Sequence, residues 1–334
     1  MRIPRILQVL AFAASAFTAL ASAEKPVIGL SLDTLKEERW QRDRDNFIHE
    51  VESLGGTVVV QSANSDDTRQ VRDVESLITR GVDVLVIVPH NGEAMTRALR
   101  SAKEANIPVI AYDRLIMNGP VAAYVTFDNV KVGELQAQWV VDRWNFDKPL
   151  RVVRIYGAPT DNNAKLFKKG QDNVLDPLIA AGKVKVVAED WALDWKPSVA
   201  KKIMNAAITR SGHDFDAVIV SNDGTAGGAI QALIEEGLAG KVIVTGQDAD
   251  LAGCQRIMRG TQSMTVFKPV SKLATLAAQM AVAAAKGRLP KAETTLDNGY
   301  MQVPCFFEKI VAVDKDNMMD TVVAAGFHSA DELK

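Results

Sequence analysis

The clearest indication of how this chain folds is Ser221-Asn222-Asp223-Gly224-Thr225-Ala226-Gly227-Gly228. This polar, glycine-rich stretch follows a largely apolar run at 216–220, and a helical segment then leads to 241–248, which contains the apolar residues Val242-Ile243-Val244 and ends in Gln247-Asp248. Apolar runs without period-two alternation are typical of parallel strands that are covered on both faces. The segment therefore predicts a strand, a helix and a second, parallel strand.

An earlier part of the chain repeats this arrangement. The run at 83–88 ends in Pro89-His90-Asn91-Gly92, a helical stretch begins at Glu93, and the apolar run 107–114 closes the unit. Further predicted elements alternate in the same way: strand 26–32, helix 37–54 and strand 57–61, then strand 151–157, helix 164–180, strand 184–187 and helix 198–209. Such alternation indicates βαβ units with right-handed crossovers. We therefore predict an α/β fold with two doubly wound, parallel-sheet lobes that face each other across a polar cleft.

The N-terminus has the order of a secretory signal peptide. Arg2 and Arg5 precede an apolar stretch at 6–20, and Ala21-Ser22-Ala23 comes before the charged residues Glu24-Lys25. This order predicts cleavage after Ala23. The alternative is an uncleaved membrane anchor, but the apolar stretch is short for the roughly 20 residues that span a bilayer. We predict that 1–23 is a signal peptide and that the mature protein is periplasmic.

Length and composition indicate an ordinary globular protein of two domains. The 334 residues exceed the roughly 250 at which single cores stop growing. Hydrophobic residues make up 47% and charged residues 24%, and the net charge of −2 gives no sign of a nucleic acid or anionic lipid as partner. The only cysteines are Cys254 and Cys305, which could be two buried thiols or one disulfide.

Polar residues follow several of the predicted strands. Ligands of open α/β sheets bind outside the carboxyl ends of the strands, so these residues are candidates for a binding site. They are Arg39 and Trp40 at the start of the first helix, then Asp113, Arg114, Asn222, Asp223, Asp248 and Lys268. Any one of them could instead cap a helix or form an Asx turn, as Asp66 is expected to do. Their joint occurrence favours a site.

The chemistry of these side chains suits a neutral molecule with several hydroxyl groups. Carboxylates and amides accept hydrogen bonds while Arg and Lys donate them, which matches a sugar better than a phosphate. The apolar face of a sugar could lie on Trp40, Trp191 or Trp195, although each Trp could equally belong to the core. The polar loop 194–197 favours Trp195.

Several motifs closely resemble the periplasmic sugar-binding proteins of ABC transporters. They extend over nearly the whole mature chain and include Glu38-Arg39-Trp40-Gln41, Ala111-Tyr112-Asp113-Arg114, Asp161-Asn162-Asn163-Ala164 and Gly246-Gln247-Asp248-Ala249. The resemblance implies a type I periplasmic binding protein with a three-segment hinge, whose lobes close on D-xylose. It also implies a membrane permease with a cytoplasmic ATPase as partner.

The resemblance further implies which residues bind the sugar. Hydrogen bonds would come from Arg39, Asp113, Arg114, Asn163, Asn222, Asp248 and Lys268, with Trp195 and Trp40 stacking on the ring and Asp161 contributing. One lobe is expected to comprise 24–128 plus 267–304, and the other 129–266 plus 305–334. The three crossings would lie at 126–129, at 265–268 and near 303–305.

Other classes of protein find less support in the sequence. A dinucleotide-binding enzyme would need G-x-G-x-x-G after the first strand, and 224–228 lacks the lysine of a phosphate-binding loop, so helix packing explains its glycines better. Asp113 and Asp248 could be posed as a hydrolase pair, but nothing in their context supports it. His90 lies at a strand end without a nucleophile, which favours a surface histidine.

A sugar-responsive repressor is also disfavoured, because a signal peptide occupies the place of a DNA-binding headpiece. We expect a monomer that is not an enzyme and that uses no cofactor, metal or nucleic acid.

Overall fold

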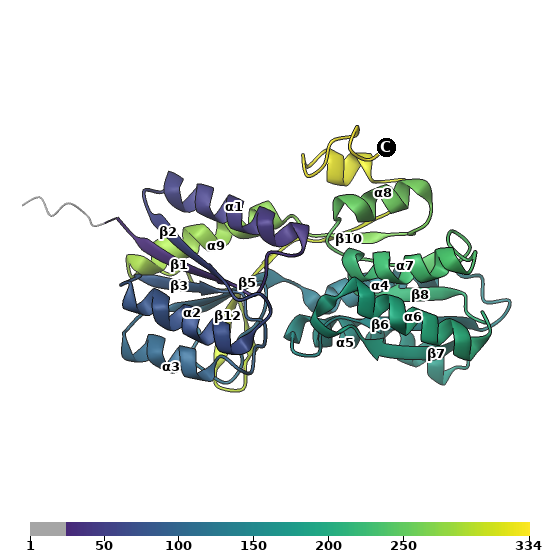
Figure 1. Cartoon of the computed structure of the whole chain (residues 1–334), viewed down its shortest axis with the longest axis horizontal. Coiled ribbons are helices and arrows are strands. Elements are labelled where there is room, and N and C mark those ends of the chain that lie inside the picture. Colours follow the sequence, from purple (N-terminus) through teal and green to yellow (C-terminus); the bar gives the residue numbers. More distant parts are fainter. Residues whose placement is uncertain (1–24) are drawn as a thin grey trace, which may run out of the picture.

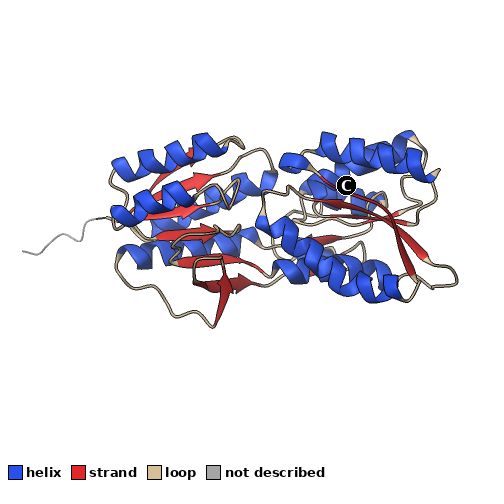
Figure 2. Cartoon of the chain, turned by 90° about the horizontal axis from the view of Figure 1, so that it is seen from below, coloured by secondary structure: helices blue, strands red, loops and turns tan. Residues whose placement is uncertain are grey.

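The computed structural model describes residues 25–334, so the predicted signal peptide lies outside the described residues. Two α/β lobes follow one another along the long axis of the molecule (Figure 1). In the view turned by 90°, the strands of each lobe lie between helices (Figure 2). This arrangement confirms the predicted fold class. No helix within the described part of the chain is long and apolar enough to span a membrane.

The first lobe contains a seven-stranded sheet in the order β11-β12-β5-β4-β3-β1-β2. All neighbouring strands are parallel except β11 and β12. Their bounds are β1 Val27–Leu32, β2 Thr57–Ser62, β3 Val84–Ile87, β4 Val109–Tyr112, β5 Ala123–Phe127, β11 Thr294–Asp297 and β12 Gln302–Glu308. Helices α1 (Glu38–Ser53) and α9 (Val270–Ala285) cover one face, and α2 (Asp67–Thr79) and α3 (Thr96–Glu104) cover the other.

The second lobe is built on a parallel four-stranded sheet in the order β7-β6-β8-β9. Its strands are β6 Leu150–Tyr156, β7 Val184–Trp191, β8 Ala217–Val220 and β9 Ile243–Val244. Helices α4 (Asn129–Asp142) and α5 (Asn162–Ala180) pack on one face, and α6 (Pro197–Ser211) and α7 (Asp223–Glu235) pack on the other. The short helix η1, Leu193–Trp195, precedes α6.

A smaller two-stranded sheet lies beside the lobes and carries the chain between them. Here β10 (Thr265–Phe267) pairs antiparallel with β13 (Val311–Val313). The C-terminal segment, with η2 Met319–Val323, returns to pack against α8, Leu251–Arg259. The lobe boundary expected at residue 304 lies inside β12, whose last residue, Glu308, pairs with Phe127 of β5.

Two local interpretations of the sequence are confirmed. Asp66 caps α2, since its side chain accepts a hydrogen bond from the backbone N–H of Arg69. A side chain at Gly228 would overlap the backbone carbonyl of Pro197, so this glycine allows α6 and α7 to pack closely. Cys254 and Cys305 are both buried and free, which excludes the disulfide.

The strand expected over 241–248 is shorter than predicted. Only Ile243–Val244 pairs in the sheet, because the chain turns out of it before Asp248. Asp248 and Ala249 have φ angles of 93° and 54°, in the left-handed region that side chains other than glycine seldom occupy. The Asp248 N–H is held by the carbonyl of Val266, 2.9 Å away. This turn brings Asp248 to the space between the lobes.

Candidate functional site

A cavity lined by residues of both lobes lies between them. It is found at the carboxyl ends of the parallel strands, where ligands of open α/β sheets bind. All ten residues predicted for the site line it, together with three that the sequence did not single out. The full lining is Glu37, Arg39, Trp40, Asp113, Arg114, Asp161, Asn163, Phe167, Trp195, Asn222, Gln247, Asp248 and Lys268.

The first lobe contributes the first turn of α1 and the segment after β4. Arg39 and Trp40 lie on the buried side of α1. Asp113 has a φ of 60°, and its carbonyl oxygen accepts hydrogen bonds from the hydroxyls of Tyr124 and Thr126 at 2.8 and 2.7 Å. The neighbouring strand β5 therefore fixes the unusual backbone that points Asp113 and Arg114 into the cavity.

In the second lobe, two of the site residues also cap helices. The Asp161 carboxylate accepts from Asn163 N at 2.9 Å at the start of α5, and Asn222 accepts from Thr225 N at 2.9 Å at the start of α7. From the sequence, helix capping and ligand binding were alternative roles for such residues. In the structure, Asp161 and Asn222 both cap a helix and line the cavity. Asp223, also noted from the sequence, does not line it and instead bonds to Gln262.

Buried charges of both signs alternate across the cavity. Arg39 Nη2 lies 2.9 Å from Asp113 Oδ2, and Lys268 Nζ lies 3.0 Å from Asp248 Oδ1. Burial raises the pKa of Asp113, but Arg39, Lys268 and Arg114 outweigh this and hold it below the ordinary value. Asp113 is therefore an ionised acceptor between cationic donors.

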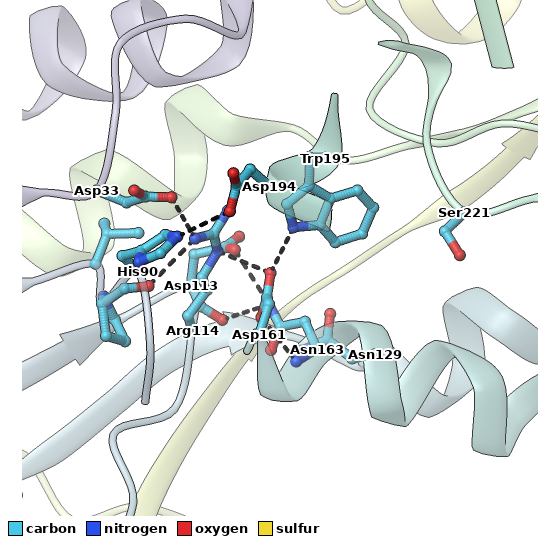
Figure 3. Close-up of polar contacts among 12 residues, drawn as sticks. Asp33, His90, Asp113, Arg114, Asn129, Asp161, Asn163, Asp194, Trp195 and Ser221 are labelled. Carbon is cyan, nitrogen blue, oxygen red and sulfur yellow. Dashed lines mark hydrogen bonds and ion pairs between the residues drawn. The ribbon is translucent and has the colours of Figure 1, made fainter. Parts of the chain in front are cut away.

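Arg114 joins residues of both lobes, as Figure 3 shows. Its Nη1 lies 2.7 Å from Asp33 Oδ2 and its Nε lies 2.8 Å from Asp161 Oδ2. Burial raises the pKa of Asp161, while Arg114 acts in the opposite direction. Trp195 Nε1 donates to the same Asp161 oxygen at 3.2 Å.

Aromatic rings form the remaining walls. The indole of Trp195 packs directly over Gly157, where a side chain would overlap the ring. The guanidinium carbon of Arg39 lies 4.0 Å from the centroid of the Trp40 ring. Trp191, the third candidate, does not line the cavity and instead packs on Tyr156 with ring centroids 4.8 Å apart.

Several acceptors in the cavity lack hydrogen bonds. Within residues 25–334, Asp113 Oδ2 and Asp248 Oδ1 have ion-pair neighbours but no hydrogen bond of acceptable geometry, and Gln247 Oε1 has no partner. A buried acceptor left unsatisfied costs about 1–3 kcal/mol. A ligand with several hydroxyl donors would satisfy them. No group of His, Cys, Asp and Glu in the described chain could hold a metal ion.

The family model described as the periplasmic binding protein domain matches residues 28–289. The chain belongs to the periplasmic binding protein family. It is similar to the D-xylose-binding periplasmic protein of Haemophilus influenzae, with 48% identity over 100% of this chain and 99% of that one. The D-xylose-binding periplasmic protein of Escherichia coli is also 48% identical, over the full length of both chains.

A solved structure extends the comparison to three dimensions. The carbohydrate transporter solute-binding protein of Chloroflexus aurantiacus, in complex with D-glucose, matches with a TM-score of 0.86 and 32% identity. The match covers 92% of this chain and 98% of that one. These family members are binding proteins and not enzymes, in agreement with the prediction for this chain. The periplasmic location predicted from the N-terminus is shared with the curated relatives.

Three lining residues were missed in the sequence, and two of them had a readable signal. Phe167 lies one turn after Asn163 on α5, so the i, i+4 spacing places both on one face. Gln247 is adjacent to Asp248 at the same strand end. Glu37 precedes α1 and makes no side-chain cap, and nothing in the sequence pointed to it.

Proposed function

We propose that this protein is a receptor that binds D-xylose between its lobes and delivers it unchanged to the permease of an ABC transporter. The observation that supports the binding role most directly is the set of buried, unsatisfied acceptors beside Arg39, Arg114 and Lys268. Such a mixed set of donors and acceptors fits the hydroxyls of a neutral sugar. D-xylose as the ligand is supported by the 48% identity to two proteins that bear its name.

The ten predicted residues are proposed to hold the sugar in two ways. Arg39, Asp113, Arg114, Asp161, Asn163, Asn222, Asp248 and Lys268 would exchange hydrogen bonds with hydroxyls, and Trp40 and Trp195 would cover the apolar face. We propose that Gln247 adds an acceptor, because its amide nitrogen already donates to Ser221 O at 3.1 Å while its Oε1 is free within the described chain.

Binding is proposed to close a hinge between lobes comprising 24–128 plus 267–308 and 129–266 plus 309–334, where the last boundary is moved from the expected residue 304 to 308 because β12 pairs with β5 up to Glu308. Three connections between the lobes support such a hinge. The chain passes from β5 to α4 through Asp128 alone, and the β10–β13 pair carries the other two connections. Closure of this kind sequesters a ligand between domains. The permease would then recognise the closed form.

Isothermal titration calorimetry of the mature protein tests this proposal. Protein freed of bound sugar by unfolding and refolding would be titrated with D-xylose, then with D-ribose, L-arabinose and D-glucose. We expect one-to-one binding that is tightest for D-xylose, and chromatography should recover the sugar unchanged. Preference for D-glucose would assign the site to a hexose, and failure of every pentose to bind would contradict the proposed ligand. Turnover of the sugar would contradict the receptor role.

A further inference from the structure

Outside the cavity, helix α1 of the first lobe contacts the C-terminal segment of the second. Arg42 Nη1 donates to the carbonyl oxygen of Phe327 at 2.9 Å, and the guanidinium carbon lies 4.7 Å from the centroid of the Phe327 ring. The C-terminal segment itself packs on α8 (Figure 1). Arg42 therefore joins the two lobes at a point away from the cavity lining.

The same guanidinium reaches a buried histidine. Arg42 Nη2 lies 3.4 Å from Nδ1 of His328, whose Nε2 lies 2.8 Å from the carbonyl oxygen of Ala249. Arginine can only donate hydrogen bonds, so Nδ1 is the acceptor and the proton is on Nε2, which donates to Ala249. Burial lowers the pKa of His328, against the opposing hydrogen bond to Ala249, and so favours the neutral ring. The contact with Arg42 thus favours the tautomer that holds Ala249.

Ala249 belongs to the turn that presents Asp248 to the cavity. Both residues have positive φ angles, and such a backbone persists only where the surroundings fix it. The Ala249 N–H donates to Thr265 Oγ1 at 3.2 Å, while its carbonyl accepts from His328 and, at 3.4 Å, from the weakly donating thiol of Cys254. His328 is therefore the stronger donor that orients this carbonyl.

Glu38 makes a second contact from α1 to the same part of the second lobe. Its Oε2 accepts from the backbone N–H of Leu251, the first residue of α8, at 3.2 Å. Its Oε1 accepts from Arg42 Nε at 3.0 Å. The Glu38–Arg42 pair thus holds the segment 249–251 at both ends, directly at Leu251 and through His328 at Ala249.

We propose that Arg42 and His328 are positioning residues that couple closure of the lobes to the shape of the Asp248 turn, without touching the ligand. This inference rests on the proposed sugar-binding function. Arg42 reaches His328 only when the lobes are closed, whereas His328 and Ala249 lie together in the second lobe in either state.

This difference between the two residues has a kinetic consequence. A contact that exists only in the closed form stabilises that form relative to the open one, and so tightens ligand binding. The sugar enters the open form, so loss of the Arg42 contact should leave association unchanged and speed release. A merely structural role for Arg42 would instead lower the stability of the ligand-free protein and leave the rate of release unchanged.

The test is stopped-flow tryptophan fluorescence with D-xylose, which reads Trp40 and Trp195 in the cavity. Arg42→Ala should raise the rate constant for release roughly three- to tenfold, with the association rate constant unchanged. Arg42→Lys keeps the charge but lacks the planar fork that spans Phe327 and His328, so its release rate should be intermediate. The control, Arg44→Ala, removes an arginine of the same helix that pairs with exposed Asp45, and it should keep the native rates.

Two variants of His328 test the second half of the relay. Glutamine can donate from a position close to that of Nε2, whereas leucine fills similar space without a donor. His328→Leu should weaken D-xylose binding, and His328→Gln should retain most of the affinity. Arg42→Ala should have a smaller effect on release in the His328→Leu background than in the native protein, because the relay is already broken there.

Thermal melting of each ligand-free variant checks that it is folded, and the Arg42 series does not depend on the His328 variants. A native release rate in Arg42→Ala would overturn the coupling, as would slower association with unchanged release, or equal effects of Arg42→Ala in both backgrounds. Each of these results would leave the proposed function intact. Absence of D-xylose binding by the native protein would overturn both.

Discussion

Arg114 Nε lies 2.8 Å from Asp161 Oδ2, and this ion pair joins the two lobes through side chains that are 6% and 3% exposed. Arg114 follows β4 of the first lobe, whereas Asp161 caps α5 of the second. Asp161 also accepts from the indole of Trp195. Arg114 therefore contacts the carboxylate that also positions the Trp195 ring at the cavity.

Arg114→Ala should weaken D-xylose binding by more than tenfold. The substitution leaves Asp33 and Asp161 as buried carboxylates without their cation, and removing one partner of a buried pair is strongly destabilising. A loss of about 1.4 kcal/mol already corresponds to tenfold in affinity. Calorimetry measures the change. Arg143→Ala is the control, because Arg143 makes an exposed pair with Asp314 and should bind normally.

Asp248→Ala should also weaken binding by more than tenfold. It removes the ion-pair partner of Lys268 Nζ, 3.0 Å away, and an acceptor oxygen that lacks a hydrogen bond. Asp248→Asn keeps one acceptor but loses the charge, so its affinity should lie between those of the native protein and Asp248→Ala. Unchanged affinity in both Arg114→Ala and Asp248→Ala would contradict the assignment of the site.

The fold could be predicted from the sequence where burial leaves a clear pattern. Strands such as β3, β4 and β8 are buried along their whole length, so they appear as continuous apolar runs between helices. β11 is largely exposed and has no such run. The early end of β9 was not predictable either, because the turn at Asp248 depends on a hydrogen bond to Val266 in a distant strand.

The expectation that ligands bind at the carboxyl ends of parallel strands located the site. It did not predict which of two neighbouring side chains lines the cavity. Asn222 and Asp223 were equivalent in the sequence, yet only Asn222 lines the cavity. Asn222 is the cap of α7 and Asp223 its first residue, so their side chains leave the chain in different directions. Asp223 accepts from Gln262 Nε2 at 2.6 Å and from Thr265 Oγ1 at 3.0 Å. Both partners lie about 40 residues away in sequence, so the residues around Asp223 could not predict these hydrogen bonds.

Gly157→Ala should weaken binding by displacing Trp195, without replacing any residue that lines the cavity. A methyl group at position 157 would overlap the Trp195 indole, so the ring must move. We expect roughly tenfold weaker binding and a change in tryptophan fluorescence. Gly224→Ala is the matched control, because the nearest atom to its added methyl group is 3.7 Å away, at ordinary contact distance. Native affinity together with a changed fluorescence would show that the position of the Trp195 ring does not matter for binding.

Asp223→Asn should change how stability depends on pH. Burial raises the pKa of Asp223 to about 7, against the opposing effect of Arg256, whereas an unfolded aspartate titrates near 3.9. Between these values the folded protein keeps a proton that the unfolded chain has lost, so this group makes the free energy of unfolding fall as pH rises from about 4 to about 7. Asparagine does not titrate, and the fall should be shallower in the variant by up to about 1.4 kcal/mol per pH unit. Urea unfolding of both proteins between pH 4.5 and 8 measures the two slopes, and parallel curves would show that Asp223 is ionised throughout this range.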